Sequence, residues 1–178
     1  MSSINTRKMA FAGVVAALYA ALTVMGASFA FGPVQFRFAE VLCILPFFFP
    51  ASSVGLFVGC FIANMLSPYG LLDIIAGPIA TLIAALFTMS LGRGNRDGVG
   101  VKALACFPPV FFNALIIGAV IAYSSTSELY HFWQAFAVNG LQVGLGQLAV
   151  LYVLGLPLMI YLPRSGAFTQ LSAQYNYK

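Results

Sequence analysis

The sequence predicts an all-α integral membrane protein, folded as a bundle of six transmembrane helices. Of the 178 residues, 61% are hydrophobic and only 7% are charged, whereas soluble domains carry about 25% charged residues. A transmembrane helix uses roughly 20 residues, so the chain has room for about five or six of them. Little length remains for a catalytic domain outside the membrane.

Long apolar segments define the expected spans: residues 8–30, 39–49, 52–66, 71–91, 103–123 and 133–162. The first segment exceeds the roughly 7–15 apolar residues of a signal peptide, and further apolar segments follow it, so we expect it to be kept as a span. The loop after it opens at Gly32 and Pro33, a helix-breaking pair. The last segment is long enough to tilt, and Pro157 is a candidate kink within it.

The stretch 39–66 could be one kinked helix or two short helices, and the basic residues decide between them. Arg7 and Lys8 place the N-terminus inside the cell by the positive-inside rule. The loop 92–102 is also predominantly basic, so it should lie inside as well. An even number of spans must then precede it, which requires two short helices. Six spans return the C-terminus to the cytoplasm and leave three loops outside: 31–38, 67–70 and 124–132.

The two short spans have a structural consequence. Each has fewer than about 16 residues, which is too short to cross the hydrocarbon core upright. Half-length helices of this kind occur where the backbone lines a cavity and does not face lipid. We therefore expect a single membrane domain, 1–178, with an internal cavity near these helices.

No pattern in the sequence indicates an enzyme, a metal site or a cofactor held by this chain. Cys43, Cys60 and Cys106 lie in apolar runs and share no metal-ligand spacing with the single histidine, His131, so we expect buried filler and no disulfide. We find no nucleophile–base set and no phosphate-binding glycine loop. The net charge of +4 is scattered over the span ends, which indicates topology and not a nucleic-acid surface.

The first span carries two parallel rows of small residues at a spacing of four. One row is Ala12, Ala16 and Ala20, and the other is Gly13, Ala17 and Ala21. In lipid, such a smooth face lets another helix approach closely and gain van der Waals contact. That helix could belong to a partner protein or to this chain itself.

Polar side chains at membrane depth are the candidate binding residues. They are Gln35, Arg37, Glu40, Asn64, Asp73, Asn113, Asn139, Gln142 and Gln147. A charge at the centre of a transmembrane helix costs about 3 kcal/mol, so an ionisable group here indicates a functional site. Two simpler roles remain open: Arg37 and Glu40 could pair near the interface, and Asp73 could cap a helix. In the six-span topology most of these groups fall near the outer end, which predicts a pocket that opens outward under the 31–38 loop.

Several stretches resemble one known family. They are residues 34–42 with Leu45 and Pro46, residues 59–64 running on to Asp73 and Gly77, residues 112–116, and residues 154–158. Together they resemble the QueT family over roughly residues 8–162. The chain departs from the family pattern at Ala39, where serine is usual, and at Gln147, where an acidic residue is common. The second departure leaves the exact ligand open.

The resemblance implies a substrate-binding S-component of an energy-coupling factor (ECF) transporter, in the cytoplasmic membrane of a prokaryote. Such subunits are six-helix bundles that take up queuosine precursors, which are 7-deazaguanines. They dock on one transmembrane coupling subunit and two cytoplasmic ATPases, which use the ATP, through small residues of the first helix. On this basis Ala12, Ala16 and Ala20 are the expected docking face.

The leading functional hypothesis is capture of a 7-deazaguanine such as preQ1, preQ0 or queuine at the outer face. Glu40 could accept the two adjacent N–H donors of the guanine-like edge, while Asn and Gln amides read its other groups. Asp73 could balance a cationic side arm. The alternatives are an S-component for another vitamin-like molecule, a solitary gradient-driven carrier, and, least favoured, an integral membrane enzyme.

Overall fold

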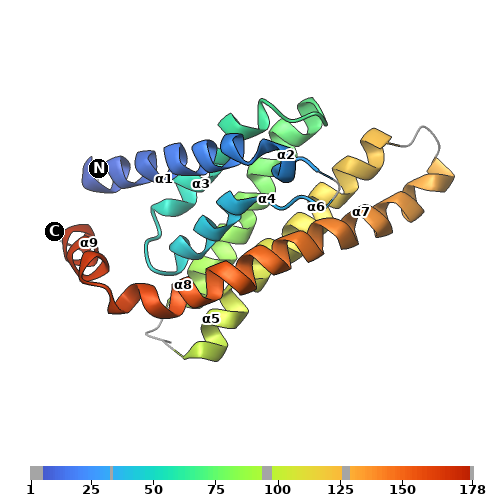
Figure 1. The fold of residues 1–178 in the computed structure, drawn as a ribbon. Helices are drawn as coiled ribbons and strands as arrows, with labels where there is room; N and C mark the ends of the chain where they lie inside the picture. Colours follow the sequence, from blue (N-terminus) through green and yellow to red (C-terminus); the bar gives the residue numbers. More distant parts are fainter. Residues whose placement is uncertain (1–5, 33, 94–97, 126–128, 177–178) are drawn as a thin grey trace.

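The computed structural model describes the chain except for residues 1–5, 33, 94–97, 126–128 and 177–178. Every regular element of the described part is helical (Figure 1). The longer helices are α1 (Thr6–Met25), α3 (Ser52–Asn64), α4 (Leu71–Gly92), α6 (Phe107–Ser125) and α7 (Leu129–Ala149). The shorter elements are α2 (Ala27–Ala30), η1 (Phe38–Phe47), α5 (Val99–Ala105), η2 (Val150–Gly155), α8 (Leu156–Tyr161), η3 (Leu162–Arg164) and α9 (Gly166–Asn176).

Four helical stretches of the described chain are long and apolar enough to cross a membrane. They are Thr6–Met25, Leu71–Gly92, Val99–Ser125 and His131–Arg164. Two shorter apolar helices, η1 and α3, coincide with the expected half-length spans 39–49 and 52–66. Many large apolar side chains are exposed, for example Leu141 at 65% and Val153 at 68%, as lipid-facing residues would be. The all-α membrane fold is therefore confirmed, with four long helices where we expected six spans.

The first of the short segments, η1, is a 3₁₀ helix and not an α-helix. Ten residues at a rise of about 2.0 Å extend roughly 20 Å, about 5 Å more than the same residues would reach in an α-helix. The segment packs against α1, α3, α4 and η2, so its backbone lies among other helices. Enclosure of this kind permits irregular backbone at membrane depth.

The long C-terminal helical stretch changes its geometry next to η1. Between α7 and α8 the backbone forms a π-helix, η2, and Pro157 follows at the start of α8. Proline has no N–H and its ring crowds the carbonyl four residues earlier, which here is that of Val153 inside η2. In place of a simple kink at Pro157, the structure thus has a π-helical turn just before the proline. Leu151 of this turn belongs to the same buried cluster as Ile44 of η1.

The contact between α1 and α3 shows what part of the alanine row of α1 packs against. Two glycines of α3 lie against the alanine row of α1: a Cβ at Gly55 would overlap the Ala12 carbonyl oxygen, and one at Gly59 would lie 2.7 Å from that of Ala16. Ala16 is only 8% exposed, while Ala12 and Ala20 are half-buried. Two members of the row expected to face a partner, Ala12 and Ala16, therefore pack against α3. The row left exposed is Gly13, Ala17 and Ala21.

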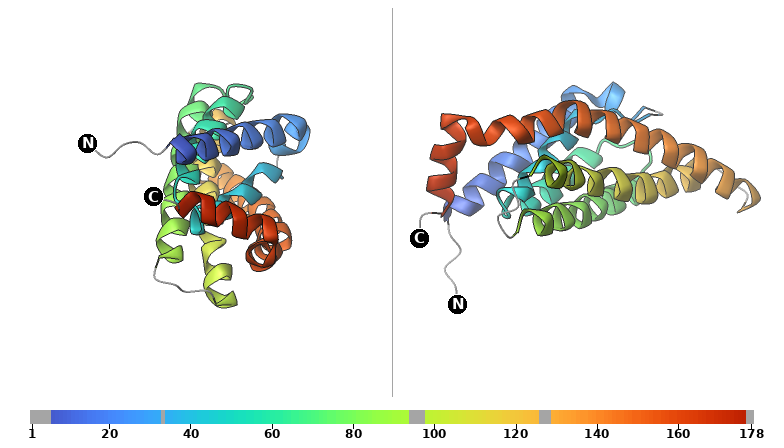
Figure 2. Two further views of the ribbon diagram at one scale, coloured as in Figure 1. Left: turned by 90° about the vertical axis from the view of Figure 1, so that its left-hand side faces the viewer. Right: turned by 90° about the horizontal axis from the view of Figure 1, so that it is seen from below.

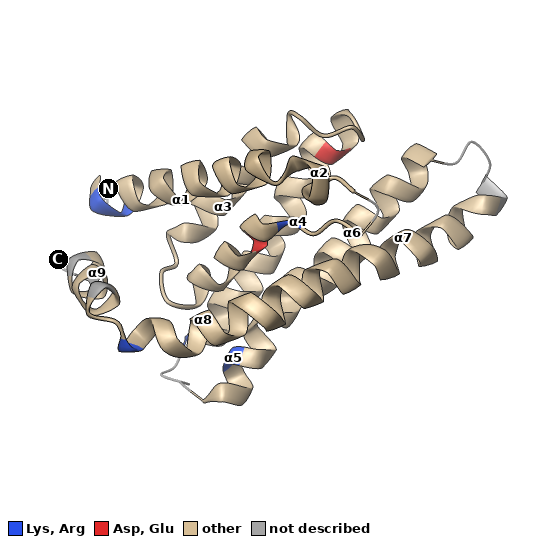
Figure 3. Cartoon of the chain, viewed as in Figure 1, with Lys and Arg blue, Asp and Glu red and all other residues tan. Residues whose placement is uncertain are grey.

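The two ends of the bundle differ in charge. The described ends of the chain, in α1 and α9, lie at the same end of the bundle, and α9 turns across that end (Figure 2). Most described lysines and arginines lie near this end of the bundle or in the neighbouring region around α5 and α8 (Figure 3). Arg37 and Glu40 instead lie together, buried inside the bundle.

Replacing Gly59 by alanine should separate α1 from α3. The added methyl would lie 2.7 Å from the Ala16 carbonyl oxygen and 2.8 Å from Tyr19 Cβ, so the helices must shift, at a cost of about 1–3 kcal/mol. We expect a lower midpoint of thermal unfolding in detergent. Gly13→Ala is the matched control, because a Cβ at Gly13 meets nothing within 4 Å. Equal unfolding midpoints for the two variants would contradict this packing.

Candidate functional site: a buried polar centre

The centre of the site is Glu40, in the first turn of η1. Its side chain is 1% exposed. The Tyr19 hydroxyl donates a hydrogen bond of 2.7 Å to Oε1, and the Cys43 thiol donates one of 3.0 Å to Oε2. Arg37 Nη1 lies 4.0 Å from Oε1, at the outer limit of an ion pair. The sequence left open a pairing of Arg37 and Glu40 near the interface, and the two residues do lie together, but buried inside the bundle.

Arg37 is buried with much of its hydrogen-bonding capacity unused. It is 3% exposed, and its guanidinium carbon lies 5.3 Å from the centre of the Phe31 ring. Nη1 makes a long contact of 3.9 Å to the Cys60 sulfur, which also accepts from the Thr81 hydroxyl at 3.4 Å. Nε and Nη2 have no partner among the described residues. Leaving charged donors buried and unpaired is costly, so this guanidinium is suited to an acceptor from outside the chain.

The loop before η1 is folded into the bundle by an unusual backbone. Gln35 has φ of 46°, in the left-handed region that a non-glycine residue rarely adopts. Its side chain is 2% exposed, and Nε2 has no partner in the described chain. Gly146 of α7 makes the close approach possible, because a Cβ there would overlap the carbonyl oxygen of Val34. Strained backbone of this kind costs about 1–3 kcal/mol and is typical of functional sites.

A second polar cluster lies where α3 meets α4. Asp73 is fully buried, and its Oδ2 accepts a hydrogen bond of 2.6 Å from the Ser67 hydroxyl. The Asn64 amide donates to the Asp73 backbone carbonyl at 2.9 Å, in space left by Gly77. Oδ1 of Asp73 and Oδ1 of Asn64 are acceptors without a donor among the described residues.

Asp73 fulfils only part of the helix-cap expectation. It lies in the first turn of α4, where the helix dipole favours a negative charge. The N-cap residue is Gly70, with φ of 71°, and α4 has no side-chain cap hydrogen bond. The carboxylate is held by the Ser67 hydroxyl instead.

Two further amides come from α6 and α7. Asn113 is 3% exposed and Gln147 is 2% exposed; the Asn113 amide nitrogen and the Gln147 amide oxygen lack partners in the described structure. These helices run antiparallel with Ala114 against Gly144. With a rise of 1.5 Å per residue, Asn113 and Gln147 then differ by only about 3 Å in height along the bundle.

Seven of the nine predicted binding residues are buried inside the bundle: Gln35, Arg37, Glu40, Asn64, Asp73, Asn113 and Gln147. The other two are not. Asn139 is half-buried, and its amide donates to the Ala135 carbonyl of its own helix at 2.8 Å. Gln142 is also only half-buried. An outward opening of this region stays a prediction.

Three buried residues that contact the charged groups, Tyr19, Cys43 and Cys60, were not among the predicted binding residues. Tyr19 is fully buried on α1 and donates to Glu40. The only signal for it was a polar aromatic side chain within a row of small residues. Cys43 and Cys60 are buried free thiols, as expected, but they also contact Glu40 and Arg37 and are more than filler. Cys43 could have been found from its spacing, because it follows Glu40 by three residues.

The helices and the buried polar centre define a multi-pass membrane protein that holds hydrogen-bonding groups away from lipid. Residues 9–164 match the family model described as QueT transporter. The chain therefore belongs to the QueT transporter family, a family of transporters and not of enzymes.

One curated relative is similar to part of this chain. The "Queuosine precursor transporter QueT" of Lactococcus lactis subsp. cremoris (strain MG1363) is 34% identical over 85 residues. The aligned region is 47% of this chain and 50% of the relative, so it spans about half of each. The comparison with solved structures finds no significant match.

Removing the Tyr19 hydroxyl should destabilise the centre. Tyr19→Phe leaves Glu40 Oε1 without its short hydrogen bond, and a buried group that loses its partner costs about 1–3 kcal/mol. We expect a lower midpoint of thermal unfolding in detergent. Tyr69→Phe is the control, since its hydroxyl is half-buried and 3.5 Å from the Phe31 carbonyl. If Tyr19→Phe unfolded no earlier than Tyr69→Phe, Tyr19 would not be a support for Glu40.

Proposed function

We propose that this protein is an S-component that binds a queuosine precursor, a 7-deazaguanine, and releases it inward through an ECF module. The observation that carries the proposal is a buried carboxylate, Glu40, beside a buried guanidinium, Arg37, whose Nε and Nη2 lack partners in the described chain. The name of the Lactococcus lactis relative, a queuosine precursor transporter, supports the substrate class. Family membership supports transport.

The chemistry of the centre suits the guanine-like edge of such a ring. Two N–H donors lie side by side on that edge, and a carboxylate can accept both in one charge-assisted contact. Glu40 already accepts from Tyr19 and Cys43, but a carboxylate has about four lone-pair sites and can take two more donors. The free Nε and Nη2 of Arg37 are suited to the ring carbonyl oxygen.

The remaining unpaired groups fit the rest of the ligand. Asn113 has a free donor and Gln147 a free acceptor, which suits ring nitrogens. The free Oδ1 of Asp73 suits a positively charged side arm, such as the amine of preQ1. Each buried polar atom without a partner costs about 1–3 kcal/mol. A ligand that pairs them regains that energy, and an analogue that lacks the matching groups is rejected.

The distribution of charge supports an orientation with both termini in the cytoplasm. The described cations outside the centre are Arg7, Lys8, Arg93, Lys102 and Arg164. Most of these cations gather toward the end that holds the chain termini (Figure 3), as the positive-inside rule requires for a cytoplasmic side. In this orientation η1 and α3 complete six crossings.

The partners in this proposal are one transmembrane coupling subunit and two cytoplasmic ATPases that use the ATP. With Ala16 covered by α3, the smooth face available for docking is the row Gly13, Ala17 and Ala21. A helix without large side chains lets a partner backbone approach closely in lipid. The docking face in this proposal is therefore the exposed row and not the alanine row expected from the sequence.

Glu40→Gln should weaken binding of preQ1 by at least about 100-fold. The new amide nitrogen cannot accept a hydrogen bond from the ligand, and the remaining oxygen has lost its charge, whereas each hydrogen bond to a charged group is worth about 1.5–3 kcal/mol. The measurement is calorimetric titration of the purified protein in detergent, with thermal unfolding to show that the fold survives. Asn139→Ala should bind as wild type, since that amide is bonded to its own helix. Wild-type affinity in Glu40→Gln would disprove the assigned contact.

Ala17→Phe should abolish uptake of labelled preQ1 in cells that contain the partner subunits, while detergent-solubilised protein still binds the ligand. A large side chain on the exposed row keeps a partner helix away. Leu86→Phe, at an exposed position of α4, is the control and should leave uptake unchanged. Uptake by this chain alone in partner-free proteoliposomes would support a solitary carrier and refute the ECF role.

A further inference from the structure

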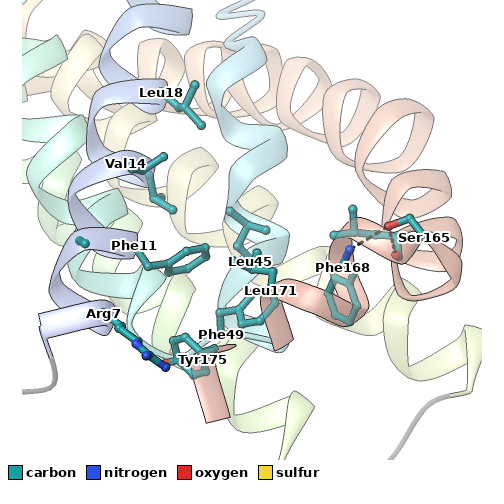
Figure 4. Close-up of a pocket in the computed structure, with 13 residues that line it drawn as sticks. Arg7, Phe11, Val14, Leu18, Leu45, Phe49, Ser165, Phe168, Leu171 and Tyr175 are labelled. Atoms are coloured by element: carbon teal, nitrogen blue, oxygen red, sulfur yellow. Dashed lines mark hydrogen bonds between the residues drawn. The ribbon is translucent and has the colours of Figure 1, made fainter. Parts of the chain in front are cut away.

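A lateral groove runs between α1, the end of η1 and α9, separate from the polar centre (Figure 4). It encloses about 810 Å³, which is in the range of sites for small ligands. Its walls are almost entirely apolar, with Phe11, Val14 and Leu18 on α1, Leu45 on η1, and Phe168 and Leu171 on α9.

The groove has the length of one lipid leaflet. On α1 its lining residues include Arg7, Phe11, Val14 and Leu18, spaced by four, three and four, so these four form one stripe of the helix. The eleven helical steps from Arg7 to Leu18 extend about 16 Å. That is about half of the roughly 30 Å hydrocarbon core. An acyl chain that entered from the end bearing Arg7 would therefore be covered along its length.

The far wall of the groove is firmly built. Tyr175 of α9 contributes more than apolar surface, because its hydroxyl accepts a hydrogen bond of 2.9 Å from the Ala51 backbone N–H. Its ring lies 5.2 Å from that of Phe49 and 5.9 Å from that of Phe11. The Phe168 ring lies 5.3 Å from that of Phe49. These contacts hold α9 across the end of the bundle, where an amphipathic helix meets the membrane interface.

Positive charge surrounds the mouth of the groove. Arg7 lines it, and Lys8 Nζ lies 5.1 Å from the centre of the Tyr175 ring, which also lines it. Both cations are exposed. An anionic group at the mouth would find two cations at interfacial depth.

We propose that this groove binds an anionic phospholipid of the leaflet on the side of the chain termini. Its acyl chain lies along Phe11, Val14 and Leu18, and its phosphate lies beside Arg7 and Lys8. A transmembrane partner helix fits this wall less well, because close helix packing in lipid uses small residues and the groove presents large ones. The small residues Gly13 and Ala17 belong to the adjacent row.

The single tryptophan of the chain makes a direct test possible. In a Trp133→Phe background, Val14→Trp places one fluorophore in the groove, and Leu145→Trp places one on an exposed apolar position of α7. Each protein is reconstituted into phosphatidylcholine vesicles with an equal fraction of brominated phosphatidylglycerol or brominated phosphatidylcholine. Bromine quenches tryptophan fluorescence only on contact, so the quenching reports which lipid occupies the site.

We expect the brominated anionic lipid to compete for the groove at least about fivefold more strongly than the brominated zwitterionic lipid, since each nearby cation favours anionic lipid. Leu145→Trp should be quenched equally by both. The preference should vanish in Arg7→Gln/Lys8→Gln and persist in Arg7→Lys/Lys8→Arg, which keeps the charge. Equal quenching at Val14→Trp, no quenching there by either lipid, or a preference that survives Arg7→Gln/Lys8→Gln would each overturn the proposal.

Discussion

Burial of the Glu40 carboxylate is the constraint on which the rest of the arrangement depends. In lipid no water can satisfy a charged group, so the protein must supply every partner. Tyr19 reaches it from α1, and Cys43 from the next turn of η1. The 3₁₀ geometry, in which residues three apart lie above one another, directs Glu40 and Cys43 to the same side. That geometry is tolerated because other helices enclose η1.

Glycines determine how closely those helices can approach. On α3, Gly55 and Gly59 allow α1 to lie near enough for Tyr19 to reach Glu40. On α7, Gly146 makes room for the loop that carries Gln35 into the interior. These contacts were not predictable from the sequence, since a glycine in a transmembrane helix does not identify the helix it meets. For the same reason the alanine row of α1 could equally have faced a partner.

The features that were predictable depend on local chemistry. Polar residues in apolar runs indicated a binding site. Glu40, Asp73 and Gln147 are buried, and their part in binding stays a prediction. The same argument failed for Asn139, because an amide can also satisfy itself by bonding back to its own helix, here at Ala135. The sequence predicted that Pro157 would disturb the helix, but not that the disturbance would be a π-helix. Proline removes a backbone hydrogen bond without specifying which geometry replaces it.

The first helix joins surfaces that would otherwise be independent. One face of α1 supplies Tyr19 to the carboxylate, a second packs Ala16 on α3, and a third exposes the small row that includes Ala17. A partner that shifts α1 by even a fraction of an ångström must therefore change the 2.7 Å hydrogen bond to Glu40. Glu40 would then hold its ligand donors less well, because its own position depends on that bond. In the proposed function, docking on α1 and ligand release would thus be linked through a single helix, with no signal needed through the remainder of the bundle.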